Sequence, residues 1–98
     1  MLPPYSTFYW QDVIIIKVDI EIQPYDNGIR LTWVDGFEIT CAKDHDAFLI
    51  KANAEGLKSL ASICLTLAQD EVPQNAHVHL DEYNSLEEGS VELIIAKG

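Results

Sequence analysis

Apolar and polar residues alternate along several short stretches of the chain, and a period of two is typical of β-strands. The longest stretch covers residues 13–22, where Lys17, Asp19 and Glu21 stand between isoleucine and valine residues. The apolar side chains of such a stretch lie on one side, so the pattern predicts a strand with one buried face. The same alternation predicts further strands over residues 29–33, 37–41, 47–52, 76–81 and 90–96.

Turn-forming residues separate the first of these strands. Residues 26–28 (Asp-Asn-Gly) tolerate a positive φ angle, and residues 35–36 (Asp-Gly) are typical of a tight hairpin turn. A polar stretch at residues 43–46 leads into the fourth strand. We therefore expect consecutive antiparallel strands in the N-terminal half of the chain.

The period changes at Asn53, where we expect a helix to begin. The Asn53 side chain can accept a hydrogen bond from the first turn, and Glu55 places negative charge near the positive end of the helix dipole. Pro73 cannot continue a helix, so the helix should end near Glu71. The predicted core-facing stripe contains Leu57, Leu60, Ala61, Cys64, Leu67 and Ala68, widened by Ile63 and Leu65. The predicted water-facing side contains Lys58, Ser59, Ser62, Thr66 and Gln69.

These elements predict an α+β fold, mainly an antiparallel sheet with one amphipathic helix on one face, in the order ββββαββ. A chain of 98 residues has room for one core, so we expect a single domain over residues 1–98. Cys41 in a strand and Cys64 on the helix are both expected to be buried thiols. Residues 1–5 have neither the basic nor the apolar part of a signal peptide, so we expect a cytoplasmic protein.

Charge limits the class of partner. The chain carries 16 acidic and 6 basic residues, a formal net charge of −10. Such a surface repels nucleic acid and anionic membranes, and no stretch of about 18 apolar residues is present to span a membrane. A basic protein is the partner that this charge would attract.

The sequence His77-Val78-His79-Leu80-Asp81 raises the question of a metal site. Two histidines two positions apart on a strand lie about 6.7 Å apart, close enough to share one ion. Asp81 lies about 13 Å from His77, too far to join them, and Asp44, His45 and Asp46 are the remaining candidates for a third ligand. We therefore predict no metal site, and keep His77 and His79 as the alternative.

No other pattern predicts catalysis. The serines lack a nucleophile-elbow context, a glycine-rich phosphate loop is missing, and adjacent Glu87 and Glu88 are typical of a solvated surface. We expect neither catalytic residues nor a cofactor. Two alternatives stay open: a metal-binding module or metal-dependent hydrolase using His77 and His79, and a subunit of a larger complex.

The C-terminal half contains four short motifs, Asn53–Leu57, Leu60-Ala61, His77–Asp81 and Ser90–Ile95. Together they resemble a family of small bacterial immunity proteins, over roughly residues 47–96. Members of this family are encoded beside polymorphic or contact-dependent growth-inhibition toxins, and each neutralises its cognate toxin by binding it. The resemblance implies inhibition without catalysis, and a nuclease is the commonest toxin in such systems.

The charge and the resemblance point to one kind of site. A nuclease needs a basic groove for its substrate, and an acidic domain can occupy that groove. We therefore expect the partner to contact exposed carboxylates and a tyrosine on two loops. These residues are Asp44, Asp46, Glu82, Tyr83, Glu87 and Glu88.

Overall fold

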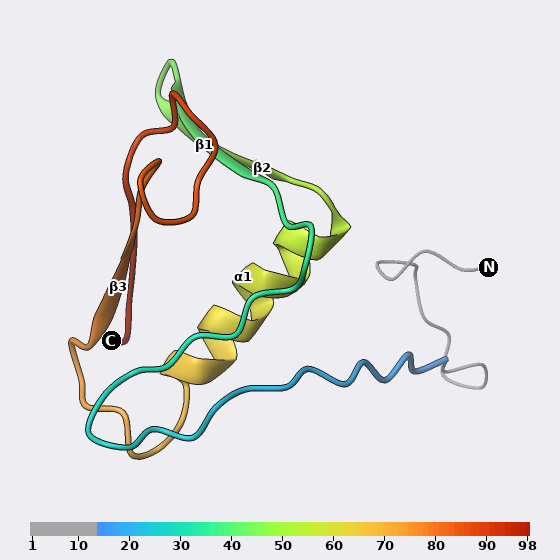
Figure 1. Ribbon diagram of the computed structural model, residues 1–98, viewed down its shortest axis with the longest axis vertical. Coiled ribbons are helices and arrows are strands. Elements are labelled where there is room, and N and C mark those ends of the chain that lie inside the picture. Colours follow the sequence, from blue (N-terminus) through green and yellow to red (C-terminus); the bar gives the residue numbers. More distant parts are fainter. Residues whose placement is uncertain (1–13) are drawn as a thin grey trace.

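The structure is a computed structural model, and it describes residues 14–98. These residues form one helix and four short strands in the order ββαββ, shown in Figure 1. The predicted α+β class is confirmed. The predicted order ββββαββ is wrong, because residues 14–22 and 29–33 are not strands. Val13, the first residue of the first predicted strand, lies outside the described residues.

The first hairpin joins β1 (Ile39–Asp44) to β2 (Ala47–Ala52). The strands are antiparallel, and the turn between them consists of His45 and Asp46. His45 has a φ of 55°, the left-handed conformation that a tight hairpin turn requires. The residues that the sequence indicated as a polar loop are therefore the end of β1 and this turn.

The two strands of this hairpin differ in burial. Ile39 and Cys41 of β1 are buried, whereas β2 is exposed over most of its length. Phe48 and Ile50 both remain in contact with solvent, although their spacing suggested one buried face. β1 is therefore the strand that contributes to the core.

The second hairpin pairs β3 (His77–Leu80) with β4 (Leu93–Ala96), again antiparallel. Val78 and Leu80 are buried, and the two histidines of β3 are exposed. The alternation predicted for this segment is confirmed. The two hairpins are separate two-stranded sheets among the described residues, so the single sheet that we expected does not form there.

Helix α1 spans Ala54–Leu67, and Asn53 caps its first turn as predicted. The Asn53 Oδ1 accepts hydrogen bonds from the N–H groups of Gly56 (2.7 Å) and Glu38 (2.9 Å). The Asn53 Nδ2 donates to the carbonyl of Gly36 at 2.8 Å. One side chain therefore caps the helix and also fixes the chain that enters β1.

The helix ends at Leu67, before the predicted end near Glu71. The Lys97 ammonium group donates hydrogen bonds to the carbonyl oxygens of Gln69 (2.7 Å) and Val72 (2.8 Å). These two carbonyl groups belong to the turn that follows α1, beyond the last residue of the helix. Lys97 thus holds the turn between α1 and β3 in place.

The buried face of α1 is not the face that the apolar pattern predicts. The buried residues of the helix are Gly56, Ser59, Ser62, Ile63, Thr66 and Leu67. The exposed residues from the predicted core-facing stripe are Leu57, Cys64, Leu65 and Ala68. The expectation of a buried Cys64 is therefore wrong, whereas Cys41 is buried as expected.

Hydrogen bonds explain both this rotation of α1 and the missing strand at residues 29–33. The Ser59 Oγ accepts a 2.9 Å hydrogen bond from the Val34 N–H, and the Ser62 Oγ donates to the Thr32 carbonyl at 3.1 Å. Two backbone groups of this segment, the Thr32 carbonyl and the Val34 N–H, are thus bonded to the helix, and Figure 1 shows the segment running beside α1. A backbone group used in this way does not join a strand ladder.

The turn predicted at residues 26–28 is present, and Asn27 has a φ of 57°. The chain on its two sides is linked by a side chain rather than by a backbone ladder. The Gln23 Nε2 donates to the carbonyl of Leu31 at 3.2 Å. The Gln23 carbonyl itself accepts a 3.1 Å hydrogen bond from Gln69, at the end of the helix.

The core lies between α1, β1 and β3. Its buried apolar residues are Ile39, Cys41, Ile63, Leu67, Val72, Val78, Leu80 and Leu86. Trp33 is half-buried against this cluster and stacks on Phe37 with ring centroids 4.6 Å apart. Within residues 14–98, no helix has the length and apolar character needed to cross a membrane.

Candidate functional site

The acidic loop, defined here as residues 81–92, connects β3 to β4. Asp81 organises its first turn: the Oδ1 atom accepts hydrogen bonds from the N–H groups of Tyr83 (2.9 Å) and Asn84 (3.1 Å). Asn84 returns a hydrogen bond from its Nδ2 to the His79 carbonyl at 2.9 Å. Asp81 therefore shapes the loop rather than joining the two histidines at a metal site.

The middle of the acidic loop is held closed by one of the predicted site residues. The Glu82 Oε2 accepts a 2.9 Å hydrogen bond from the Gly89 N–H, across seven positions of sequence. Leu86 between them is buried in the core. Glu82 is exposed but has a structural partner, so it orders the loop as well as adding charge to it.

The acidic loop is also attached to the free edge of β1. The Glu87 N–H donates to the Ile39 carbonyl at 2.8 Å, and the Val91 N–H donates to the Cys41 carbonyl at 2.8 Å. The Ser90 hydroxyl accepts from the Cys41 N–H at 3.2 Å. A strand edge normally presents unpaired backbone groups, and here the loop occupies that edge. The charges of the loop are thus carried on a fixed backbone.

Several side chains of the acidic loop remain in solvent. Tyr83 is 90% exposed, and Glu87 and Glu88, four and five positions further along the loop, are exposed as well. The loop also includes Glu92, whose Oε2 lies 3.4 Å from the Nδ1 of His79. Glu92 is not among the site residues predicted from the sequence. The sequence signals it only as a polar residue that alternates with apolar ones in the last predicted strand.

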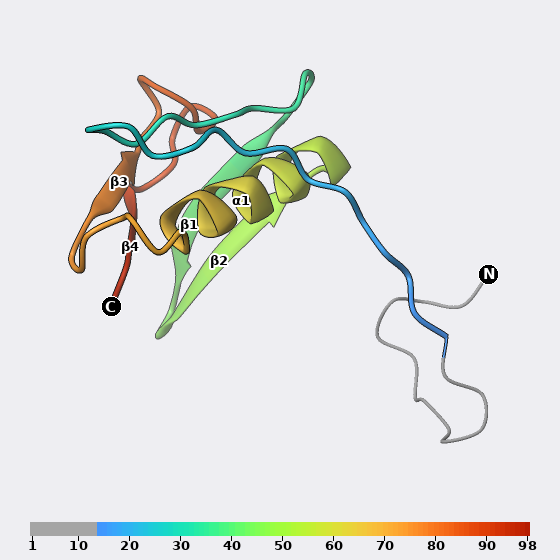
Figure 2. The same cartoon turned by 90° about the horizontal axis from the view of Figure 1, so that it is seen from below.

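Asp44 and Asp46 lie at the tip of the β1–β2 hairpin, not beside the acidic loop. Figure 2 separates the two features: the hairpin tip and the loop lie on opposite sides of the molecule in that view. Both aspartates are exposed, and His45 between them lies 3.8 Å from the Asp44 carboxylate. The predicted site residues therefore form two separate acidic surfaces.

His77 and His79 lie side by side on β3, with ring centroids 4.9 Å apart. The Nδ1 of His77 is 2.9 Å from the Asn75 carbonyl, and His79 faces Glu92. Residues 14–98 contain no group of three or more His, Cys, Asp or Glu side chains arranged to hold a metal ion. The loop around His45, considered as a source of a third ligand, lies at the other hairpin.

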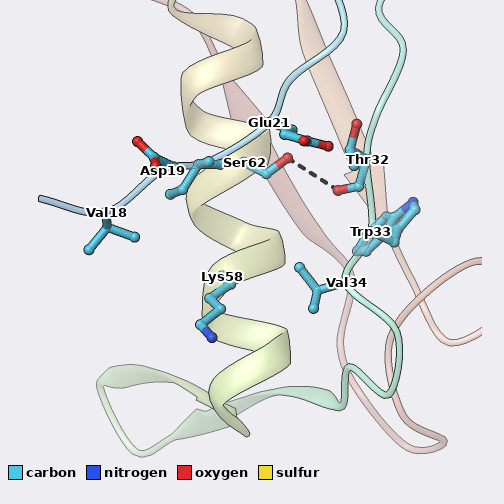
Figure 3. A pocket seen from close by; sticks show the side chains of 9 residues that line it. Val18, Asp19, Glu21, Thr32, Trp33, Val34, Lys58 and Ser62 are labelled. Atoms are coloured by element: carbon cyan, nitrogen blue, oxygen red, sulfur yellow. Dashed lines mark hydrogen bonds between the residues drawn. The ribbon is translucent and has the colours of Figure 1, made fainter.

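A surface hollow of about 350 Å³ lies where the extended N-terminal segment passes α1. Residues 18–21 and 32–34 form two of its walls, and Lys58 and Ser62 of the helix form the third, as Figure 3 shows. The Ser62 hydroxyl donates a hydrogen bond to the Thr32 carbonyl between two of these walls, drawn as a dashed line in Figure 3. The hollow is mostly apolar, and none of the predicted site residues lines it.

The C-terminal part of the chain, which contains both the capped helix and the acidic loop, matches a known family model. The model is Immunity protein 32, and the match covers residues 47–98, just over half of the chain. The chain belongs to the Immunity protein 32 family. Comparisons with curated proteins and with solved structures gave no match.

Membership of this family confirms the resemblance inferred from the sequence motifs. It implies a cognate toxin as the partner and neutralisation of that toxin as the role. An immunity protein of this kind is not an enzyme, so the alternative of a hydrolase using His77 and His79 is wrong. The acidic loop lies entirely within the matched region.

Proposed function

We propose that this immunity protein inhibits a basic nuclease toxin, and that it does so by placing the acidic loop in the toxin's substrate groove. The observation that carries the proposal is the attachment of the loop to β1 through Glu87 and Val91. The loop therefore presents its carboxylates and Tyr83 from a fixed backbone. The toxin would act on nucleic acid in the cytoplasm, where the immunity protein would have to meet it.

Charge supports the choice of a nuclease. A nucleic-acid groove is lined by lysine and arginine side chains, and a chain with net charge −10 is attracted to it over long range. The exposed Glu87 and Glu88 would stand where the substrate phosphates bind. Because the groove cannot hold nucleic acid and this loop together, binding alone would stop cleavage.

The fixed conformation of the acidic loop favours tight binding of the toxin. Ordering a flexible loop on binding costs free energy, so a loop that is already fixed keeps more of its contact energy. Hydrogen bonds to Asp81, Glu82 and the β1 edge fix this loop before any partner arrives. An exposed tyrosine on such a frame is typical of a residue that contributes strongly to binding.

The test uses the toxin domain encoded next to this chain and a double charge reversal, Glu87→Lys with Glu88→Lys. The variant should associate with the toxin at least about ten-fold more slowly, and its association rate should depend less on salt concentration. Stopped-flow mixing measures both quantities. A nuclease assay with a fluorescent RNA or DNA substrate measures the accompanying loss of inhibition.

Two further variants make this test specific. Asp70→Lys with Glu71→Lys changes the net charge equally at exposed positions after α1, and it should have a much smaller effect. Asp44→Lys with Asp46→Lys examines the hairpin tip. If the hairpin variant slows association and the Glu87 and Glu88 variant does not, the toxin binds at the other acidic surface and the proposal fails.

A further inference from the structure

Residues 14–22 form an extended segment that leads away from the body of the protein, drawn in blue in Figure 1. Its backbone makes no hydrogen bond with any other residue in the described range 14–98. Its apolar side chains are also exposed: Ile15 is 73% accessible and Val18 is 65% accessible. The segment thus combines strongly β-forming side chains with backbone groups that have no hydrogen-bonding partner in the range 14–98.

A segment with these properties is suited to pairing with another strand, because strand addition satisfies the backbone and covers the side chains. The order of residues indicates which strand fits. Reading outward from Val18, the next positions on the two sides are Lys17 and Asp19, which have opposite charges. The positions after these are Ile16 and Ile20, then Ile15 and Glu21, and the outermost are Ile14 and Ile22.

This order makes the segment complementary to itself in the antiparallel direction. When Val18 lies opposite Val18 of a second copy, Lys17 of each copy lies opposite Asp19 of the other. Opposite charges at directly facing positions stabilise a strand pair, and facing β-branched side chains do the same. The apolar positions 14, 16, 18, 20 and 22 then all lie on the same face of the pair.

We propose that residues 14–22 of two copies pair as antiparallel strands and join the protein into a two-fold symmetric dimer. The partner at this surface is therefore a second copy of this chain. Such an interface uses the same surface on both copies, which is the usual arrangement in homodimers. The proposal is independent of the toxin and concerns the free immunity protein.

Other registers are less favourable. A shift of one residue turns the apolar faces of the two strands to opposite sides and separates the charged pairs, so that Lys17 faces Val18 and Asp19 faces Ile16. A shift of the symmetry centre to Lys17 or to Asp19 places that residue opposite its own copy, so two like charges face each other. The arrangement centred on Val18 pairs all nine residues without a like-charge contact, and Ile15 opposite Glu21 is its one pair of an apolar and a charged residue.

The packing of the segment agrees with this arrangement. Ile20 and Ile22, at its C-terminal end, are half-buried on the body of the protein, so the apolar face is the one turned inward there. Residues 18–21 also form a wall of the hollow beside α1 (Figure 3). In the dimer, Ile16 and Ile14 of the second copy come opposite Ile20 and Ile22. The exposed end of each segment is thus brought toward the body of the other copy.

Charge exchange tests the pairing, with Lys17→Asp, Asp19→Lys and the double variant carrying both changes. Each single variant places two pairs of like charges face to face, so its dimer should dissociate at least about ten-fold more readily than the wild type. The double variant restores opposite charges and should form a dimer again. An equimolar mixture of the two single variants should form a heterodimer, because each supplies the charge that the other lacks.

Sedimentation velocity over a dilution series gives the mass, which should be about 22 kDa, twice the 11.0 kDa of one chain. A moderate salt concentration of about 0.15 M screens the long-range repulsion between two acidic chains. Lys51→Asp, at an exposed position of β2, changes the net charge equally and should leave the dimer intact. Circular dichroism verifies that every variant is folded.

Three results would overturn the proposal. The first is a wild-type protein that stays monomeric at the highest concentration reached. The second is a dimer that persists unchanged in both single variants, which would place the interface elsewhere. The third is a double variant that remains monomeric while folded, because the proposed register requires that exchanging the two charges restores the pair.

Discussion

The carbonyl oxygen of Glu38 lies 2.5 Å from the point where a Cβ atom on Gly56 would stand. The Cγ1 of Ile39 is 3.0 Å from the same point. This close approach brings the first turn of α1 directly against the chain that enters β1. Asn53 bonds to the same chain through the Glu38 N–H, so the junction of helix and hairpin is fixed by packing and by hydrogen bonds together.

Gly56→Ala should therefore destabilise the protein. In an open helix this change raises stability by about 0.5–1 kcal/mol, because alanine is the better helix former. Here the added methyl group meets a backbone oxygen that cannot move alone, and overpacking of this kind costs about 1–3 kcal/mol. Urea unfolding followed by circular dichroism should show a net loss of stability.

Gly28→Ala provides the matched control, because no atom lies within 4 Å of its added Cβ. Its stability should stay within about 0.5 kcal/mol of the wild type. A Gly56→Ala variant that is as stable as Gly28→Ala, or more stable than the wild type, would contradict the close packing described here.

Replacement of a buried serine in α1 should cost more than replacement of an exposed leucine. Ser59→Ala leaves the Val34 N–H without its acceptor in a partly buried position, with a loss of about 1–3 kcal/mol. Leu57 is 56% exposed, so Leu57→Ala should change stability by no more than about 0.5 kcal/mol. Chemical denaturation of both variants checks the order, and a larger loss for Leu57→Ala would mean that the apolar stripe faces the core after all.

The two thiols should differ in reactivity. Cys64 is exposed on α1, whereas Cys41 is 2% accessible in β1. A thiol reagent such as dithionitrobenzoate should react promptly with one thiol in the native protein, and with the second only after unfolding. Cys64→Ser should remove the prompt reaction. Two thiols that react at the same slow rate would show that Cys64 is covered.

Tyr83→Ala should weaken toxin binding without changing the stability of the free protein. The side chain is 90% exposed, so its loss should alter the free energy of unfolding by less than about 0.5 kcal/mol. At the proposed interface, its removal should raise the Kd at least about ten-fold. Phe48→Ala is the matched control, since this aromatic residue is 76% exposed on β2, within the other hairpin. Calorimetric titration with the toxin would contradict the prediction if both variants bound equally well.

Local sequence patterns correctly predicted the elements that depend mainly on contacts between residues close together in the sequence. The cap at Asn53 depends on a side chain and an N–H group three residues away, and it was predicted correctly. The alternation over β3 predicted which side chains are buried, because Val78 and Leu80 pack in the core while the histidines between them do not. The motifs of this same region also indicated the immunity protein family, which the family match confirms.

The candidate site could be predicted only in part. Acidic residues on two loops were visible in the sequence, but their separation into a hairpin tip and an acidic loop depends on how the hairpins are placed. The structural roles of Asp81 and Glu82 were also hidden, because the N–H groups that they bind are defined only by the fold of the loop. The attachment of Glu87 to β1 joins residues 48 positions apart, and no local pattern signals it.

The sequence by itself determined the helix and its start, the period of each apolar segment, the net acidic charge and the family. The tertiary structure decided which faces and edges are used. Residues 14–22 have the pattern of a strand, yet a strand also needs a backbone partner, and the described chain supplies none. Ser59 and Ser62 are polar side chains, but their hydroxyl groups bond the Val34 N–H and the Thr32 carbonyl, and that face of α1 lies inward. The hydropathy of a side chain reflects only its transfer out of water. A buried polar side chain is stable when it forms a hydrogen bond, and hydropathy does not show whether a distant part of the chain supplies the partner.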